Sequence, residues 1–388
     1  MSALFGNRIL FAAFTCRNNL VSLARKQQRI NVAGFHKRPY DRSYKWRKWK
    51  LGAGVFGGGL FCLSLPIFRD EYQLLEGNKE HPEKDKVQWG PYDIPISRKV
   101  DGPNKLGVKL TLFQYQSCPF CCKVRAFLDY RGIPYDVVEV NPVFRTQLKF
   151  SEYRKVPIVI LEEKPKQYKQ LNDSSAIISM LETYLMDPQQ KFDRVAEKYP
   201  SVASADSRKE KKEIMNRYHV MFGERLPPDG SFDRIREEVK WRKWVDEVLV
   251  HSLSPNIYRT PGESYQTFLH FSRVGDWERY FNPVERRLIV LVGSAAMYLV
   301  GKRLKSKYGL KDDVRQSLYE QIHTWTRAVG ANRFRGGRRP DLSDLAVFGV
   351  LNSIEGCRAF DDLMRRADLR RWYSDTAEAV RGHAGCRS

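Results

Sequence analysis

Apolar residues recur with two different spacings in the middle of the chain. They alternate with polar residues over positions 109–115, and positions 158–161 form a short apolar run, which predicts two strands. Over positions 123–130 and 176–184 they recur every three or four residues, which predicts two helices. This alternation of strands and helices favours an α/β domain, which we place at residues 108–190.

Helical spacing dominates the rest of the chain. From residue 238 onward apolar side chains fall on single helical faces, and positions 284–308 and 312–329 continue the pattern. Asp341 precedes another apolar run and is followed by Asp344 three residues later, which is typical of a capped helix start. The sequence therefore predicts an all-α domain over residues 191–388.

The beginning of the chain is strongly basic. Residues 1–50 contain twelve Lys and Arg residues and one acid, Asp41, so they supply +11 of the formal net charge of +22. We therefore expect a presequence-like segment over residues 1–44, with a basic tail without a targeting role as the alternative. No nucleic-acid-binding motif accompanies the charge, so no nucleic-acid partner is expected.

A stretch without charge follows, over residues 51–68. Its length and its Lys, Arg and Trp neighbours predict a hydrophobic membrane anchor within residues 45–70. Its glycines and Pro66 weaken it, so a segment lying on the membrane surface is the alternative. Residues 71–107 are polar and proline-containing, which predicts a linker. We expect a membrane-associated protein, with mitochondria favoured over the Golgi membrane, or over the cytosol after N-terminal cleavage.

The motif Cys118-Pro119-Phe120-Cys121 falls between the first predicted strand and the first predicted helix. The seven cysteines are scattered and odd in number, which argues against a secreted disulfide framework. A zinc site would need a second such pair or a spaced His pair, and neither follows, so no metal is expected. A Cys-x-x-Cys pair at a strand-to-helix turn is typical of thioredoxin-like proteins.

Cys118 is placed to be the reactive thiol of this pair. We expect it at the N-cap of the helix, with Pro119 at the first helical position, where a missing N–H costs nothing. Free amide groups and the positive end of the helix stabilise a thiolate there, whereas Cys121, one turn later, stays a thiol.

The thiol motif and several other segments resemble one known family. Together with residues 133–140, 153–157 and 171–175, the motif resembles the membrane-associated prostaglandin E synthase type 2 family, over about residues 110–373. The resemblance implies a glutaredoxin-like thioredoxin fold followed by a helical domain like that of glutathione transferases. It further implies glutathione and haem as ligands and a homodimer.

The resemblance implies two contacts with glutathione. Pro157 is expected to be cis and Val156 to offer its backbone to the tripeptide; a proline that only begins a strand is the alternative. Asp173 and Ser174 open the helix 176–184 and would meet the γ-glutamyl end, with a plain N-cap role for Asp173 as the alternative.

By the same resemblance, three residues of the helical domain are haem contacts. They are His251, Ser254 and Arg303, of which Arg303 would pair with a propionate. An ordinary packed histidine is the alternative for His251.

Three functions are compatible with these motifs. The resemblance implies isomerisation of the lipid endoperoxide prostaglandin H2 to prostaglandin E2, in which a Cys118 thiolate attacks one peroxide oxygen and leaves unchanged. Tyr115 would hydrogen-bond the sulfur or the substrate and Phe120 would face the apolar substrate, although both residues could simply pack. The alternatives are a glutaredoxin-type thiol-disulfide oxidoreductase, in which Cys121 resolves the mixed disulfide, and a haem–glutathione binding protein.

Overall fold

The computed structural model describes residues 91–104, 106–165, 167–204, 211–222 and 232–386. The predicted presequence-like segment 1–44, the membrane anchor 45–70 and the first part of the linker lie outside the described residues. Among the helices that are described, none combines the length and the apolar character that crossing a membrane requires.

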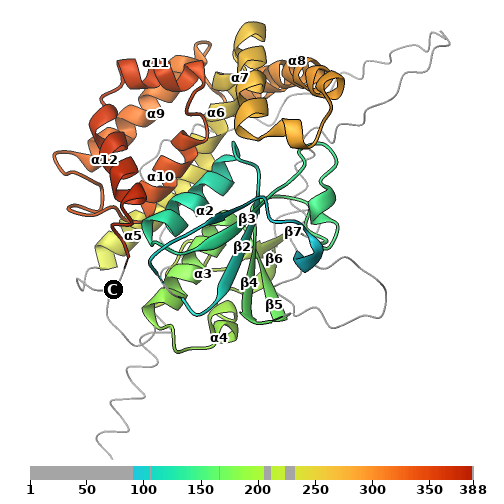
Figure 1. Cartoon of the computed structure of the whole chain (residues 1–388). Helices are drawn as coiled ribbons and strands as arrows, with labels where there is room; N and C mark the ends of the chain where they lie inside the picture. The colour runs from blue at the N-terminus through green and yellow to red at the C-terminus, as the bar shows by residue number, and fades with distance from the viewer. Residues whose placement is uncertain (1–90, 105, 166, 205–210, 223–231, 387–388) are drawn as a thin grey trace, which may run out of the picture. The chain divides into compact units, whose positions relative to one another are not determined.

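A five-stranded sheet forms the centre of the first of two structural regions, here called the sheet region (Figure 1). Across the sheet the strands are β1 (Arg98–Val100), β3 (Tyr135–Glu139), β2 (Lys109–Gln114), β4 (Ile158–Lys164) and β5 (Gln167–Asn172). Strands β2 and β3 are parallel, and helix α2 (Pro119–Tyr130) connects them; the other neighbouring strands are antiparallel. Helix α3 (Ser174–Met186) follows β5 and packs beside α2. This arrangement confirms the predicted thioredoxin-like fold.

The sheet begins before residue 108, where the sequence places the domain boundary. Strand β1 lies in the segment interpreted as a linker, and Lys99 is paired with Asp136 of β3. The strand has three residues, two of them exposed, so it carries no alternating apolar pattern that would reveal it. Two short 3-10 helices, η1 (Pro91–Asp93) and η2 (Thr146–Leu148), complete this region.

The second region is helical, as predicted, except for one hairpin. Strands β6 (Ser201–Ser204) and β7 (Lys211–Ile214) form that hairpin inside the range predicted to be all-α. The helices are α4 (Phe192–Ala196), α5 (Phe232–Trp244), the π-helix η3 (Val245–Leu249), α6 (Val250–Ile257), α7 (Pro261–Val274), the 3-10 helix η4 (Trp277–Arg279), α8 (Pro283–Lys307), α9 (Val314–Val329), α10 (Leu342–Asn352), α11 (Arg358–Arg366) and α12 (Arg370–Arg381).

The two faces of the sheet are buried against different partners, because successive side chains of a strand point to opposite sides. Leu112 and Val159 belong to a large core that α2, α3 and the later helices share. Phe113 and Ile158 belong to a smaller cluster, which the loop residue Phe150 helps to close. The sheet is therefore buried on both faces, and the helical region shares one continuous core with it.

Helix α10 holds the back of α2. An added Cβ on Gly349 of α10 would lie 2.6 Å from the Cα atom of Lys123 in α2, so the two helix backbones nearly touch. The predicted capping box of Asp341 and Asp344 fixes the start of α10.

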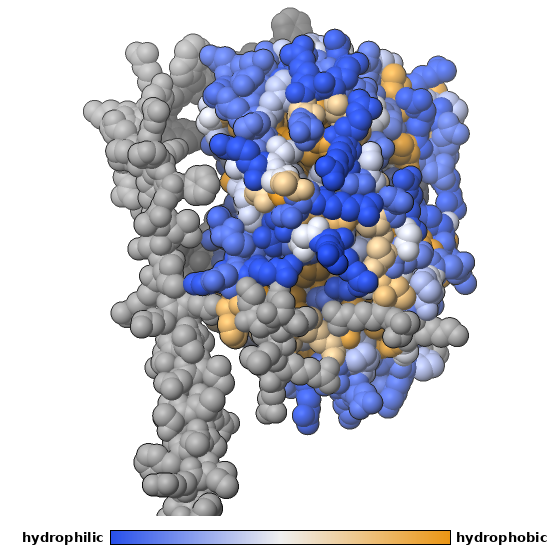
Figure 2. All heavy atoms as spheres, turned by 90° about the vertical axis from the view of Figure 1, so that its left-hand side faces the viewer, coloured by the Kyte–Doolittle hydropathy of each residue, from blue (hydrophilic) through white to orange (hydrophobic). Residues whose placement is uncertain are grey.

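The face shown in Figure 2 is mainly hydrophilic, with apolar side chains in small separate areas.

Candidate functional site

Cys118 lies at the turn that leads from β2 into α2. Its amide donates to the Tyr115 carbonyl at 3.1 Å, and its extended backbone (φ −78°, ψ 123°) makes it the N-cap residue, with Pro119 first in the helix. The predicted N-cap position is thus confirmed. Cys118 is partly exposed, whereas Cys121 and Cys122 are buried.

The surroundings of Cys118 favour its thiolate. The pKa of Cys118 is lowered, first because the Cys121 thiol donates a hydrogen bond to its sulfur. The amides of Cys121 and Phe120 also donate, and the charge of Arg125 adds to them, while burial opposes the shift. Position 118 therefore supplies a nucleophilic thiolate at a lower pH than an ordinary cysteine does.

The neighbouring cysteines are held as thiols. Burial raises the pKa of Cys121 well above its ordinary value, and its hydrogen bond to Cys118 raises it further. Burial also raises the pKa of Cys122 to about 11, and its sulfur accepts from Arg125 Nη2 at 2.9 Å. Cys122 is thus a packing residue behind the site.

Two aromatic residues flank the thiol turn. Burial raises the pKa of Tyr115 to about 12, and the charge of the nearby Cys118 adds to this rise. The charge and the hydrogen bond of Arg145 lower the pKa, but by less. Its hydroxyl therefore keeps its proton at neutral pH and can act as a donor. Phe120 is partly buried against the main core, with Lys123 Nζ 5.5 Å from its ring centroid. Sequence patterns gave no sign of Arg145, because its contact with Tyr115 depends on the tertiary fold.

The loop before β4 brings a further tyrosine to the site. The Val156–Pro157 bond is cis, as predicted, and Val156 is partly buried against the smaller cluster. Burial raises the pKa of Tyr153, and the charges of Asp173 and Cys118 raise it further, while the Asp173 amide donates to its hydroxyl. Tyr153 is thus close enough to interact with both the thiol and the start of α3. The sequence analysis assigned it no role, although its place just before the cis proline was a usable signal.

Asp173 caps helix α3. Its Oδ1 atom accepts from the amides of Ser175 at 2.9 Å and Ala176 at 3.1 Å, and its backbone adopts a positive φ of 68°. Ser174 is buried at the first helical position. The cap role of Asp173 is confirmed, and the contacts of Asp173 and Ser174 with glutathione stay a prediction.

A buried charge network joins this helix start to the helical region. Lys123 Nζ of α2 forms an ion pair with Asp246 of η3 and donates to Ser175 Oγ at 3.0 Å. Ser175 Oγ in turn donates to Asp246 Oδ2 at 2.6 Å. Burial opposes ionisation of Asp246, but the charge and hydrogen bond of Lys123 outweigh it, so its pKa is lowered. The network therefore fixes the positions of α2, α3 and η3 relative to one another.

The predicted haem contacts lie on neighbouring helices. His251 and Ser254 belong to α6 and the exposed Arg303 to α8, and these two helices pack together. The His251 ring is stacked on Tyr308, with ring centroids 4.1 Å apart. An imidazole, a hydroxyl and a guanidinium can each donate a hydrogen bond to a carboxylate, which is the chemistry that contacts with propionates would need.

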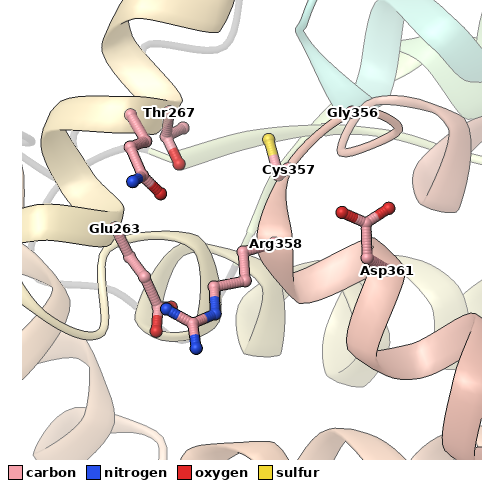
Figure 3. A pocket seen from close by; sticks show the side chains of 7 residues that line it. Glu263, Thr267, Gly356, Cys357, Arg358 and Asp361 are labelled. Atoms are coloured by element: carbon pink, nitrogen blue, oxygen red, sulfur yellow. The ribbon is translucent and has the colours of Figure 1, made fainter.

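A cavity lies in the helical region, lined by residues of α7 and of the start of α11. It has a volume of about 250 Å³. Figure 3 shows Glu263 and Thr267 on one side of it and Cys357 and Arg358 on the other, with the Glu263 carboxylate near the Arg358 guanidinium. Burial raises the pKa of Cys357 to about 11, so this thiol is not a nucleophile at neutral pH. Within the described ranges no three His, Cys, Asp or Glu side chains group closely enough to hold a metal ion.

Comparison with known proteins shows which families this chain is similar to. Residues 112–189 match the family model described as glutathione S-transferase, N-terminal domain. The chain is 48% identical to prostaglandin E synthase 2 of Mus musculus over 281 residues, which are 72% of each chain. It is 46% identical to prostaglandin E synthase 2 of Danio rerio over 279 residues, which are 70% of this chain and 71% of that protein. A glutathione S-transferase III structure in apo form matches 71% of this chain and 95% of its own, with 13% identity and a TM-score of 0.39.

The sheet with its thiol turn and cis proline, followed by helices on a shared core, defines a glutathione-transferase-like protein. The sequence identity to the two prostaglandin E synthases, and the share of each chain that it covers, define a narrower family. The chain belongs to the prostaglandin E synthase 2 family.

Proposed function

We propose that this protein is a glutathione-dependent prostaglandin E synthase that isomerises prostaglandin H2 to prostaglandin E2. The names of its relatives, prostaglandin E synthase 2, support the activity, and the glutathione transferase family model supports the use of glutathione. The observation that carries the mechanism is the partly exposed Cys118 at the N-cap of α2, where the Cys121 thiol and the amides of Cys121 and Phe120 lower its pKa.

In the proposed reaction the Cys118 sulfur forms a bond to one oxygen of the endoperoxide while the O–O bond breaks. The other oxygen leaves as an alkoxide and takes up a proton. Loss of the hydrogen from the carbon that carries the S–O oxygen then forms the ketone, and the S–O bond breaks to return the thiolate. No net oxidation occurs, so the step is an isomerisation.

Other residues of the turn assist this step. The Tyr115 hydroxyl, which keeps its proton, donates to the sulfur or to a substrate oxygen. Phe120 offers an apolar contact to the lipid. Glutathione lies along the backbone of Val156 beside Pro157, with its γ-glutamyl end at Asp173 and Ser174.

The mechanism is tested by two single variants assayed on an endoperoxide and on a disulfide, with glutathione present and haem excluded. Cys118→Ser should abolish isomerisation, because a serine hydroxyl is scarcely ionised near neutral pH. Cys121→Ser should keep most of it, because a hydroxyl can still donate to the Cys118 sulfur. Full isomerase activity in Cys118→Ser would overturn the mechanism.

A glutaredoxin-type oxidoreductase is the second candidate, because Cys118 at the N-cap and Cys121 in the first turn of α2 form a Cys-x-x-Cys pair at the strand-to-helix turn. In that cycle Cys121 resolves the mixed disulfide, so Cys121→Ser would stall the reduction of protein disulfides. An inactive wild type on the endoperoxide, together with this loss, would favour the oxidoreductase.

We include haem as a second ligand, held through its propionates by His251, Ser254 and Arg303. Haem, when bound, would supply an iron centre that can bind a thiol, and the isomerisation above does not require it. The position of the three residues on adjoining helices supports this contact. Protein purified with glutathione and haem should show a Soret band that weakens in Arg303→Gln, and an unchanged spectrum in that variant would contradict the assignment.

We also propose a membrane-associated homodimer imported into mitochondria. The basic N-terminal segment and the uncharged stretch 51–68 support import and attachment. Val284, Leu288 and Leu291 of α8 are each more than half exposed and lie on one helical face, which supports pairing with a second copy. A reporter fusion lacking residues 1–40 should stay in the cytosol, and sedimentation should give twice the mass of the chain.

A further inference from the structure

A turn beside the start of α3 is fixed by two buried donors. Ser179 Oγ of α3 donates to the Arg217 carbonyl at 2.8 Å, and Arg242 Nη1 of α5 donates to the Tyr218 carbonyl at 2.7 Å. Arg242 Nη2 also reaches the Ser175 carbonyl at 3.0 Å, which joins the turn to the first turn of α3. Ser179 and Arg242 are almost completely buried. The backbone of the turn is therefore held in place whatever its side chains do.

Arg217 extends from this turn toward the cap of α3. Its Nη1 atom lies 3.5 Å from Asp173 Oδ2, the carboxylate oxygen that the cap hydrogen bonds do not use. The Arg217 and Asp173 side chains are 30% and 27% exposed, so a ligand can reach both. A guanidinium group has five N–H donors in a planar fork, and one long contact with Asp173 leaves several of them for an incoming carboxylate.

Tyr218 provides an independent sign that a ligand group belongs here. Only 8% of this residue is exposed, yet its buried hydroxyl has no hydrogen-bond partner. The Arg217 guanidinium carbon lies 4.9 Å from the centre of its ring. Burial raises the pKa of Tyr218, and the charges of Asp246 and Asp173 raise it further, while the charge of Arg217 lowers it. A neutral buried donor without an acceptor is costly, and a ligand oxygen would satisfy it.

We propose that Arg217 and Tyr218 complete, together with Asp173, a subsite for an α-amino-acid zwitterion. The Arg217 guanidinium and the Tyr218 hydroxyl bind the carboxylate, and the Asp173 carboxylate binds the ammonium group. The inference rests on the proposed glutathione binding, because the γ-glutamyl end of glutathione carries such a zwitterion. The subsite selects ligands by that end and not by their thiol.

The test is calorimetric titration of the full chain with glutathione and with cysteinylglycine, which keeps the thiol but lacks the γ-glutamyl group. Arg217→Gln should weaken glutathione on the order of 10- to 100-fold, as expected for a lost charge-assisted hydrogen bond, and leave cysteinylglycine unchanged. Tyr218→Phe, which keeps the ring and its packing, should weaken glutathione by about 3- to 10-fold. Arg366→Gln, an exposed change on α11, is the matched control and should have no effect.

Each outcome decides the proposal. Glutathione affinity unchanged in both Arg217→Gln and Tyr218→Phe would overturn the subsite while glutathione binding by the protein stands. An equal loss of both ligands in Arg217→Gln would also overturn it, because the side chain would then act on the whole site. A wild type that binds no glutathione would overturn the proposed glutathione dependence and the subsite together.

Discussion

At the scale of single residues, two thiols one helical turn apart are driven toward opposite protonation states. The hydrogen bond between them lowers the pKa of Cys118, which accepts it, and raises that of Cys121, which donates it. Burial adds to the rise at Cys121 and opposes the fall at Cys118. One member of the pair is thereby the nucleophile and the other its proton-bearing neighbour.

The first prediction concerns the pH dependence of Cys118. Because its pKa is lowered, the thiolate persists as the pH falls below the ordinary thiol value of about 8.5, and alkylation should persist with it. Cys121→Ala removes the donor, so the midpoint of alkylation should move to higher pH. The rate of iodoacetamide labelling at Cys118, followed by mass spectrometry against pH, measures both. A wild-type midpoint at or above about 8.5 would contradict the assignment.

At the scale of elements, the contact between α2 and α10 sets the position of the thiol helix. An added Cβ at Gly349 would lie 2.6 Å from the Lys123 Cα atom and 2.8 Å from the Cys122 carbonyl carbon, both backbone atoms that cannot rotate away. Only a residue without a Cβ allows this approach. The start of α10 is in turn held by the capping box of Asp341 and Asp344.

The second prediction follows from this contact. Gly349→Ala should lower the free energy of unfolding by about 1–3 kcal/mol, because the helices must separate to admit a methyl group. Gly262→Ala in α7 is the control, since its Cβ would meet no atom within 4 Å. That change should be neutral or stabilise by about 0.4–1 kcal/mol. Urea unfolding of both variants gives the comparison, and equal effects would mean that the helices do not meet at Gly349.

At the scale of the whole molecule, a buried ion pair connects the sheet region to the helical region. The Lys123 side chain is 1% exposed and reaches Asp246, which lies 123 positions further along the chain. Ser175 hydrogen-bonds both partners. With the shared core, this network should make the two regions unfold as one unit.

The third prediction is a loss of stability that both regions report. Lys123→Met leaves the Asp246 carboxylate buried without its counter-charge and should cost about 3–5 kcal/mol. Lys240→Met breaks the exposed pair with Glu237 and should cost at most about 1 kcal/mol. Tryptophan fluorescence, to which Trp325 and four other tryptophans of the helical region contribute, and alkylation of buried Cys121 should give the same urea midpoint in Lys123→Met. Separate midpoints would show that the two regions unfold independently.

The local elements of this protein were predictable because neighbours in the chain decide them. The strand Lys109–Gln114, the N-caps at Cys118 and Asp173 and the box at Asp341 each depend on residues within a few positions. The Cys-x-x-Cys spacing belongs to the same group, since it places both sulfurs on one turn of a helix. Strand β1 escaped prediction because its three residues are stable only when paired with β3.

The sequence by itself determined which residue is the N-capping thiol, since a helix start is a local property of the chain. Only the tertiary structure decided what surrounds it. Arg145 beside Tyr115, Asp246 beside Lys123 and Arg217 beside Asp173 are pairs from distant parts of the chain. Such pairs leave no spacing pattern, because burial and packing of the complete core, not the neighbouring residues, bring their charges together.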